Sequence, residues 1–319
     1  MEHEIAGQAV KAAMDGALVG TADRKKEPMT GKKALKAMER VMNALFFICG
    51  MVAVAFVLLI SIYLIISGLP AILEIGPINF LFGTRWYAST GDFGIFAIIL
   101  TSFAGTAGAI LVGVPIGLMT AIFLSKVAPP KFAAVVHAAV ELLAGIPSMV
   151  YGLVGMILLV PAIRVAFDLP SGATLLAAII VLAVMILPSI INVSETALRA
   201  VPQEYEEASL ALGATKIETY FRVSLPAASS GVATAVVLGV GRAIGEAMAI
   251  IMVAGNVANM PGLFTSVRFL TTAIASEMSY ASYGSLQRNA LYSIGLVLFL
   301  FIMLINVILN VFIKNKKEA

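Results

Sequence analysis

Uncharged runs dominate the pattern of hydrophobic and polar positions along this chain. Seven of them span 41–73, 93–125, 142–163, 169–194, 223–241, 247–267 and 289–313. A helix of about 20 mostly apolar residues crosses the roughly 30 Å hydrocarbon core of a bilayer. Each run is long enough for such a helix, so the pattern predicts a chain that crosses a membrane several times.

Six transmembrane helices fit these runs best. Residues 223–267 could hold one helix or two, because Arg242 and Glu246 interrupt them. Basic residues near helix ends tend to stay in the cytoplasm, and six spans place sixteen Lys and Arg on the side of both termini and four on the other. We therefore expect both termini in the cytoplasm. The predicted helices cover 43–66, 95–124, 134–160, 172–193, 229–255 and 290–313.

Composition agrees with a membrane protein and excludes several other classes. Hydrophobic residues make up 60% of the 319 residues and charged residues only 12%, about half the share in an average soluble domain. So few charges could not cover a soluble globule, and the apolar content is too high for a disordered chain. The single cysteine, Cys49, cannot form an intrachain disulfide or a thiolate metal centre.

The loop over 67–94, which this topology places outside, contains the only tryptophan of the chain. Trp86 is accompanied by Phe80, Phe82 and Tyr87. Because aromatic side chains are enriched at membrane–water interfaces, we expect these four residues to anchor the loop in the headgroup region.

The cytoplasmic loop over 195–226 carries signals for two short helices. Pro202 suits the first position of a helix, and Gly213 interrupts the helix that follows. Thr215 and Glu218 have the spacing of a capping box, which starts a second helix. We predict a helix–glycine–helix elbow that lies flat at the cytoplasmic face.

The residue spacing in this elbow resembles the EAA pattern of permeases from ATP-binding-cassette (ABC) importers. That pattern reads E-A-A, three residues, G, nine residues, I-x-L-P, and this chain differs only by Ser for the second Ala and Val for Ile. The resemblance implies that the elbow docks on a separate ATPase subunit. A short rigid helix between two spans can pass a partner's movement into the membrane. The coupling residues that it implies are Glu206, Glu207, Ala208, Gly213, Leu225 and Pro226.

An arginine falls at the midpoint of the fifth predicted helix. Arg242 and Glu246 are four residues apart, which places them on one helix face. A charge at this depth costs at least about 2.5–3.5 kcal/mol, so it is usually paired or faces a water-filled path. The pair is either a structural ion pair that locks two helices or part of a substrate pathway. In the second case Arg242 contacts an oxyanion through two donors, and Glu246 orients the arginine.

Other polar residues in the apolar runs carry weaker signals. His137 and Glu141 are four residues apart near the start of the third helix, and we expect them to cap it. Pro147 removes a backbone hydrogen bond and predicts a kink. The sequence contains no nucleotide-binding loop, metal-ligand cluster or hydrolase triad. We therefore expect no catalytic residue, metal or cofactor in this chain, and no enzymatic activity.

Most of 75–313 resembles the phosphate ABC-transporter permeases, in particular the PstC-type subunit. The segments that carry the resemblance are Phe82-Gly-Thr-Arg-Trp86, Phe93-Gly-Ile95, Pro115-Ile-Gly-Leu118, Gly145-Ile-Pro-Ser-Met-Val-Tyr-Gly152, Ala197-Leu-Arg-Ala-Val-Pro202, Gly239-Val-Gly-Arg-Ala-Ile-Gly-Glu-Ala-Met248 and Val253-Ala-Gly-Asn256. The family usually has Thr where this chain has Ala247. If that hydroxyl touches substrate, this chain lacks the contact.

The resemblance implies an all-α type I importer permease of the MetI-like fold in a bacterial or archaeal cytoplasmic membrane. It divides the chain into a basic cytoplasmic tail (1–40), a first transmembrane helix with an extracytoplasmic loop (41–94), a permease core (95–313) and a cytoplasmic tail (314–319). The implied partners are an ABC ATPase dimer that binds ATP and Mg²⁺, a homologous PstA-type permease, an extracytoplasmic phosphate-binding protein and membrane lipid, with no nucleic acid. Phosphate would cross near Arg242.

Three other functions remain open on the sequence alone. The importer could carry another oxyanion, such as sulfate or molybdate. The chain could be an ATP-independent secondary transporter or channel, although such a protein has no need of an ATPase-docking elbow. It could also be a membrane scaffold or sensor, in which Arg242 and Glu246 are only structural.

Overall fold

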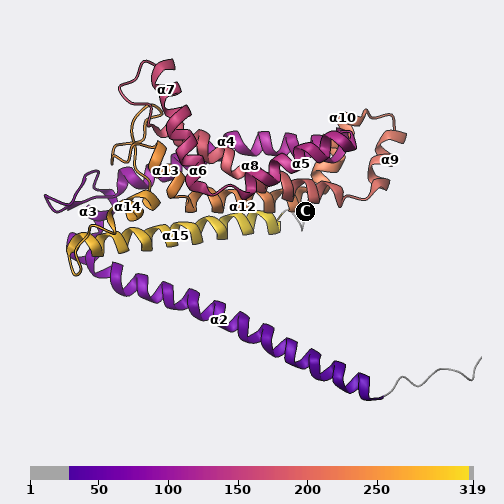
Figure 1. Cartoon of the computed structure of the whole chain (residues 1–319), viewed down its shortest axis with the longest axis horizontal. Coiled ribbons are helices and arrows are strands. Elements are labelled where there is room, and N and C mark those ends of the chain that lie inside the picture. The colour runs from indigo at the N-terminus through magenta and orange to yellow at the C-terminus, as the bar shows by residue number, and fades with distance from the viewer. Residues whose placement is uncertain (1–28, 316–319) are drawn as a thin grey trace, which may run out of the picture. The chain divides into compact units, whose positions relative to one another are not determined.

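The structure, a computed structural model, describes residues 29–315 and is almost entirely helical (Figure 1). Of these residues, those up to Ile60 form one unit and those from Ser61 form another. Helix α2 (Met29–Ile75) belongs to both units. The other elements are α3 (Pro77–Phe82), β1 (Trp86–Tyr87), β2 (Asp92–Phe93), α4 (Phe96–Ile122), η1 (Phe123–Val127), α5 (Pro130–Gly145), α6 (Ser148–Val154), η2 (Gly155–Leu159), α7 (Val160–Ala166), α8 (Leu175–Arg199), α9 (Gln203–Ala211), α10 (Lys216–Thr219), η3 (Tyr220–Ser224), α11 (Leu225–Ala227), α12 (Ser229–Gly245), α13 (Met248–Val253), α14 (Leu270–Glu277) and α15 (Leu286–Asn315), where η marks a π-helical turn.

Helix α2 is longer than the predicted first span, 43–66. Its 47 residues are about twice the number that a bilayer requires. It begins at Met29, inside the predicted tail, because 32–39 consists of good helix formers; residues 1–28 of that tail lie outside the described residues. At the other end Gly76, with φ +91°, precedes Pro77 and separates α2 from α3.

Helix α8 is the centre of the helical bundle and contacts α4, α12, α5 and α6. Fifteen of its 25 residues are buried. Glycines on α4 allow the two backbones to approach, since a Cβ on Gly113 would lie 2.8 Å from Ile186 and one on Gly117 would lie 2.7 Å from Ile190. Small residues at a helix interface permit close packing where lipid supplies no hydrophobic driving force.

Five described helices are long and apolar enough to span a membrane, and a bent pair supplies a sixth. The five are Met38–Ile75, Phe96–Val127, Ser148–Ala166, Leu175–Arg199 and Leu286–Ile308. In the sixth, Lys216–Ala227 and Ser229–Gly245 meet at 74°. The prediction of a multi-pass helical membrane protein is confirmed.

Two predicted spans are broken where the sequence suggested continuous helices. The predicted helix 134–160 divides at Ile146 and Pro147, both in extended backbone, because proline disfavours the helical conformation at the residue before it. The predicted helix 229–255 divides at Glu246, which is also extended, with φ −74° and ψ 129°. The shorter helices α6 and α13 then pack against each other.

The two ends of the bundle carry different structures (Figure 1). Helices α9 and α10 lie at one end, and α3 and α14 lie at the other. At the second end β1 and β2 form a short antiparallel hairpin in which Trp86 pairs with Phe93. A buried cluster of Phe80, Trp86, Ile95 and side chains from α14 and α15 packs beneath it.

Candidate functional site

The predicted helix–glycine–helix elbow is present in the structure. Helix α9 ends before Gly213, which has φ +87°, a left-handed conformation that glycine adopts without a steric cost. The Thr215 hydroxyl accepts a hydrogen bond from the Glu218 N–H, and the Glu218 carboxylate accepts one from the Thr215 N–H. This confirms the capping box, while Pro202 precedes α9 as its N-cap and is not its first helical residue.

Glu206 points inward and joins the elbow to the end of α4. Its carboxylate forms an ion pair with Lys126 of η1 and accepts a hydrogen bond from the Ser224 hydroxyl at 2.8 Å. The Tyr220 hydroxyl donates to the Lys126 carbonyl at 3.2 Å. Two polar contacts through Lys126 therefore attach the elbow to the α4 span, and Tyr220 and Leu225 also pack in a cluster with Ala121 and Ile122 of α4.

The elbow also exposes large apolar side chains. Leu212 is 91% exposed and Ile217 is 70% exposed. Leu212 lines a notch of about 330 Å³ together with Ser209, Gly213, Ala214, Glu218 and Arg222. Large apolar side chains exposed together at the end of a loop are typical of a surface that a partner covers.

The six predicted coupling residues therefore divide between two faces of the elbow. Glu207 and Ala208 are exposed on α9, and Gly213 and Pro226 are exposed as well. Glu206 makes the inward contacts described above, and Leu225 packs partly buried in a cluster near Leu198 and Ala228. Only the exposed members can contact a partner directly.

Arg242 and Glu246 do not form the predicted pair. Arg242 lies in the last turn of α12, which ends at Gly245, and Glu246 follows in extended backbone. No hydrogen bond or ion pair joins their side chains within the described residues. The Glu246 carboxylate instead accepts a hydrogen bond from the Ala249 N–H at 3.0 Å and caps α13. The described structure therefore contains no contact through which Glu246 orients the arginine, and its role in the pathway stays a prediction.

The Arg242 guanidinium makes no hydrogen bond or ion pair within the described residues. The side chain is partly exposed, and a Cβ on the adjacent Gly241 or on Gly245 would meet no atom within 4 Å. A cation at the C-terminal end of a helix is favoured by the helix dipole, which accounts for part of its presence. Its five donors remain free to bind an anion.

A buried acid near the elbow end was missed by sequence reasoning. Glu195 of α8, whose side chain is only 3% exposed, accepts from His137 at 2.8 Å and pairs with Arg199 at 2.7 Å. The predicted His137–Glu141 cap is wrong, because His137 faces α8 and Glu141 is exposed. In the sequence, only the four-residue spacing of Glu195 and Arg199 could have indicated that Glu195 is paired. The His137 contact depends on how α5 packs on α8.

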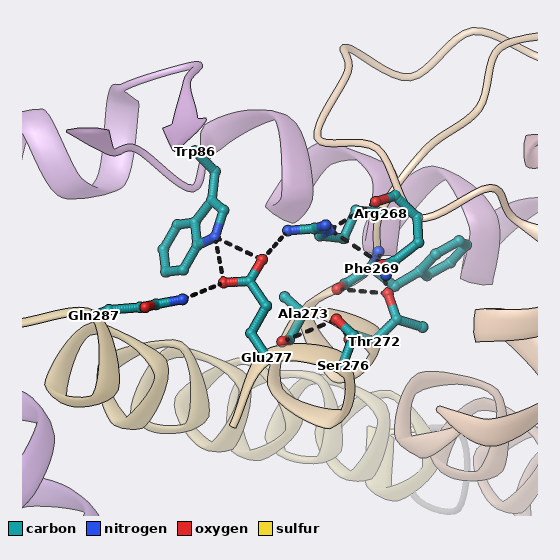
Figure 2. A network of polar contacts seen from close by, with 9 residues as sticks. Trp86, Arg268, Phe269, Thr272, Ala273, Ser276, Glu277 and Gln287 are labelled. Atoms are coloured by element: carbon teal, nitrogen blue, oxygen red, sulfur yellow. Dashed lines mark hydrogen bonds and ion pairs between the residues drawn. The ribbon is translucent and has the colours of Figure 1, made fainter. Parts of the chain in front are cut away.

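A second polar network lies at the end of the bundle that carries β1 and β2 (Figure 2). Glu277 of α14 accepts hydrogen bonds from the Trp86 indole at 3.0 and 3.1 Å and from Gln287 at 3.1 Å, and it also pairs with Arg268. Arg268 Nε donates to the carbonyl and side-chain oxygens of Asn256 at 3.0 and 3.1 Å. The network joins the β1 hairpin to α14 and α15.

The predicted role of the aromatic residues as membrane anchors is wrong for two of them. Trp86 is 5% exposed and Phe80 is fully buried, and Trp86 donates to a carboxylate inside the protein. Phe82 and Tyr87 are largely exposed, so anchoring stays a prediction for these two. Sequence alone could not distinguish the two buried aromatic residues from the two exposed ones, since all four occur in one short loop.

Comparisons with known proteins agree with this architecture. The model of the family "Binding-protein-dependent transport system inner membrane component" matches residues 113–316. The chain is 42% identical to the probable ABC transporter permease protein YqgH of Bacillus subtilis, over 81% of this chain and 86% of that protein. It is 31% identical to the phosphate transport system permease protein PstC of Haemophilus influenzae, over 89% of this chain and 95% of that protein.

A solved structure shares the fold. An inward-facing conformation of the MetNI methionine ABC transporter has a TM-score of 0.53 and 22% sequence identity, and it covers 70% of this chain and 94% of that one. The family match covers more than half of the chain and includes the elbow, α8, α12 and Arg242. The chain belongs to the family of binding-protein-dependent transport system inner membrane components.

Proposed function

We propose that this chain is the transmembrane permease subunit of an ATP-driven importer of inorganic phosphate. The observation that carries the proposal is the similarity to permeases named for phosphate transport, which includes the 31% identity over 89% of this chain to the Haemophilus influenzae protein. A Mycobacterium tuberculosis relative with the same kind of name is 32% identical over 88% of this chain. The elbow and a free arginine on α12 are features that such a permease needs.

The elbow is the proposed contact with the ATPase. Family members of this kind work with ATPase and binding-protein partners, and the exposed Leu212 and Ile217 offer an apolar surface for a groove in the ATPase. ATP and Mg²⁺ would bind to that partner and not to this chain. Movement of the elbow would reach α4 through Lys126 and α12 through the 74° bend after α11.

Arg242 is the proposed anion contact in the substrate pathway. A guanidinium binds two oxygens of a phosphate in its plane, and the guanidinium of Arg242 has no partner within residues 29–315. Glu246, four residues after Arg242 in the chain, is retained in the proposal as a pathway residue, although its carboxylate caps α13.

The assembly and its orientation are part of the same proposal. A homologous second permease of the PstA type would complete the pathway, two ATPase copies would sit beneath the pair, and an extracytoplasmic phosphate-binding protein would deliver the substrate. Both termini and the elbow would face the cytoplasm of a bacterium or archaeon. The division into a tail (1–40), a first span with its loop (41–94), a core (95–313) and a tail (314–319) follows from this orientation.

Reconstituted transport tests the proposal. The permease pair and ATPase would be placed in liposomes with ATP inside, and uptake of radiolabelled phosphate would be measured with the binding protein outside. We expect ATP-dependent uptake that excess unlabelled phosphate suppresses and that sulfate and molybdate do not. Suppression by sulfate or molybdate at equal concentration would favour the alternative oxyanion, and uptake without ATP would favour a secondary transporter.

A further inference from the structure

A polar cavity opens beside the network at the β1 end of the bundle. Its volume is about 560 Å³, and it lies between residues 84–88 and residues 256–260. Arg268 and Glu277 form another part of its wall, where Figure 2 shows them with Trp86. This end lies opposite the elbow (Figure 1), so the cavity is separate from the ATPase contact.

Two arginines of the cavity wall have donors without a partner in the described residues. The Glu277 carboxylate already accepts from Trp86, Arg268 and Gln287. Arg268 uses Nε and Nη1 in the network, which leaves its second terminal nitrogen without a partner. The Arg85 side chain is exposed, and its guanidinium makes no hydrogen bond or ion pair within residues 29–315. The cavity therefore offers unused cationic donors.

The charges of the wall favour an anion. Arg85 and Arg268 contribute two positive charges and Glu277 one negative charge, and the lining contains no other Asp, Glu, Lys or Arg. Arg85 also borders a neighbouring cavity, but that one contains Glu74 and Asp92, whose carboxylates would repel an anion. The first cavity is the better anion site for this reason.

We propose that this cavity is a binding site for a free tetrahedral oxyanion, in which Arg85 supplies two donors and Arg268 a third. The volume accommodates such an ion with part of its hydration shell. The evidence for the site itself consists of the donors and charges of the cavity wall. Its role as an outer capture site, upstream of Arg242, rests on the proposed function and on the predicted topology, which places this end outside.

Tryptophan fluorescence can report on the site directly. Trp86 is the only tryptophan in the chain and lines the cavity. The full chain, purified in a maltoside detergent, would be titrated with inorganic phosphate at constant ionic strength, with chloride as the reference salt. We expect a saturable change in Trp86 emission with phosphate and none with chloride.

Two arginine variants separate the site from general charge effects. Arg85→Gln should weaken the apparent affinity for phosphate at least about tenfold, because it removes a charged pair of donors. Arg164→Gln is the matched control, since the Arg164 side chain is also exposed and has no hydrogen bond or ion pair in the described chain, but it lies on α7 and does not line the cavity. We expect it to titrate like the wild type, and circular dichroism should show both variants folded.

A titration with a lipid completes the experiment. A short-chain phosphatidylglycerol would be titrated in the same way, because a lipid headgroup carries the same phosphate chemistry. A response to this lipid alone, no response to phosphate, or an equal response in Arg85→Gln would each overturn the proposal. The measurement needs neither ATP nor transport, so a positive result stands even if reconstituted phosphate uptake fails.

Discussion

The Glu246 carboxylate accepts a hydrogen bond from the Ala249 N–H at 3.0 Å and so caps α13. This relationship explains how α12 and α13 can be separate helices within one predicted span. A helix that starts inside a membrane protein leaves N–H groups without acceptors, and the Ala247 N-cap has no side chain to supply one. Glu246 supplies the acceptor, and the Thr271 hydroxyl donates to the Glu246 carbonyl at 2.7 Å.

We expect Glu246→Ala to lower the free energy of unfolding by about 1 kcal/mol, the usual cost of a lost N-terminal cap. Glu246→Gln should lose less, because its amide oxygen can still accept the Ala249 N–H. Thermal unfolding of both variants in detergent measures the difference. If Gln is as damaging as Ala, the charge matters and not the cap.

We expect Arg242→Gln to leave the unfolding free energy within about 0.5 kcal/mol of the wild type, since the guanidinium has no partner in the described residues. Phosphate uptake should fall at least about tenfold, because a charged hydrogen bond contributes roughly 1.5–3 kcal/mol. Arg242→Lys should keep the charge but lose the two-donor contact and give an intermediate rate. Normal uptake by Arg242→Gln would end the pathway assignment.

We expect Lys126→Gln to uncouple ATP hydrolysis from uptake. It removes the partly buried ion pair to Glu206. Such a contact contributes about 1 kcal/mol. Its loss corresponds to roughly a fivefold change in the equilibrium between the attached and the detached elbow. The ratio of phosphate imported to ATP hydrolysed in liposomes measures the effect. Lys131→Gln is the control, because Lys131 is exposed and unpaired in the described chain; an equal loss there would contradict the assignment.

Gly213 tests whether the elbow depends on backbone geometry. Its φ is +87°, and an added Cβ would meet no atom within 4 Å, so any cost of Gly213→Ala comes from the backbone and is about 1–2 kcal/mol. Gly213→Asn should be milder, since asparagine adopts the left-handed region more readily. Coupled ATPase activity should follow the order Gly, Asn, Ala. Full activity in all three would show that the elbow tolerates another conformation.

Replacement by alanine should have different effects at Gly145 and Gly152, the two ends of one motif. A Cβ on Gly152 would lie 2.8 Å from the Ala249 Cα and 2.9 Å from its carbonyl oxygen, so Gly152→Ala pushes α6 away from α13 at a cost of about 1–3 kcal/mol. A Cβ on Gly145 meets nothing within 4 Å, and Gly145→Ala should be neutral or slightly stabilising. Thermal unfolding of the two variants provides the comparison, and similar midpoints would contradict the α6–α13 contact.

Local features of the sequence predicted much of the fold. Most of the long uncharged runs form membrane-length helices, because a helix satisfies its own backbone in lipid, but the run 247–267 forms only the short helix α13. The capping box at Thr215 was equally predictable, since its partners are three residues apart. The same local reasoning failed for Trp86, because its burial depends on Glu277, 191 residues away.

The helix breaks mark the limit of this reasoning. Pro147 indicated a break, whereas Arg242 and Glu246 only raised the possibility of two helices in 223–267, which we interpreted as one. The assumption of a continuous helix therefore paired Glu246 with Arg242, whereas in the structure α12 ends at Gly245 and the Glu246 carboxylate caps α13. Similarly, His137 was matched with the nearest acid along its helix and bonds to Glu195 across helices.

The sequence by itself determined the number and approximate positions of the spans, the elbow and the presence of an arginine within an apolar run. These properties follow from hydrophobicity and from contacts within a few residues. Only the tertiary structure decided which charges are paired, because ion pairs such as Lys126–Glu206 and Arg268–Glu277 join different elements. It also leaves Arg85 and Arg242 without partners in the described chain, and these two free cations are the candidates for binding an anion.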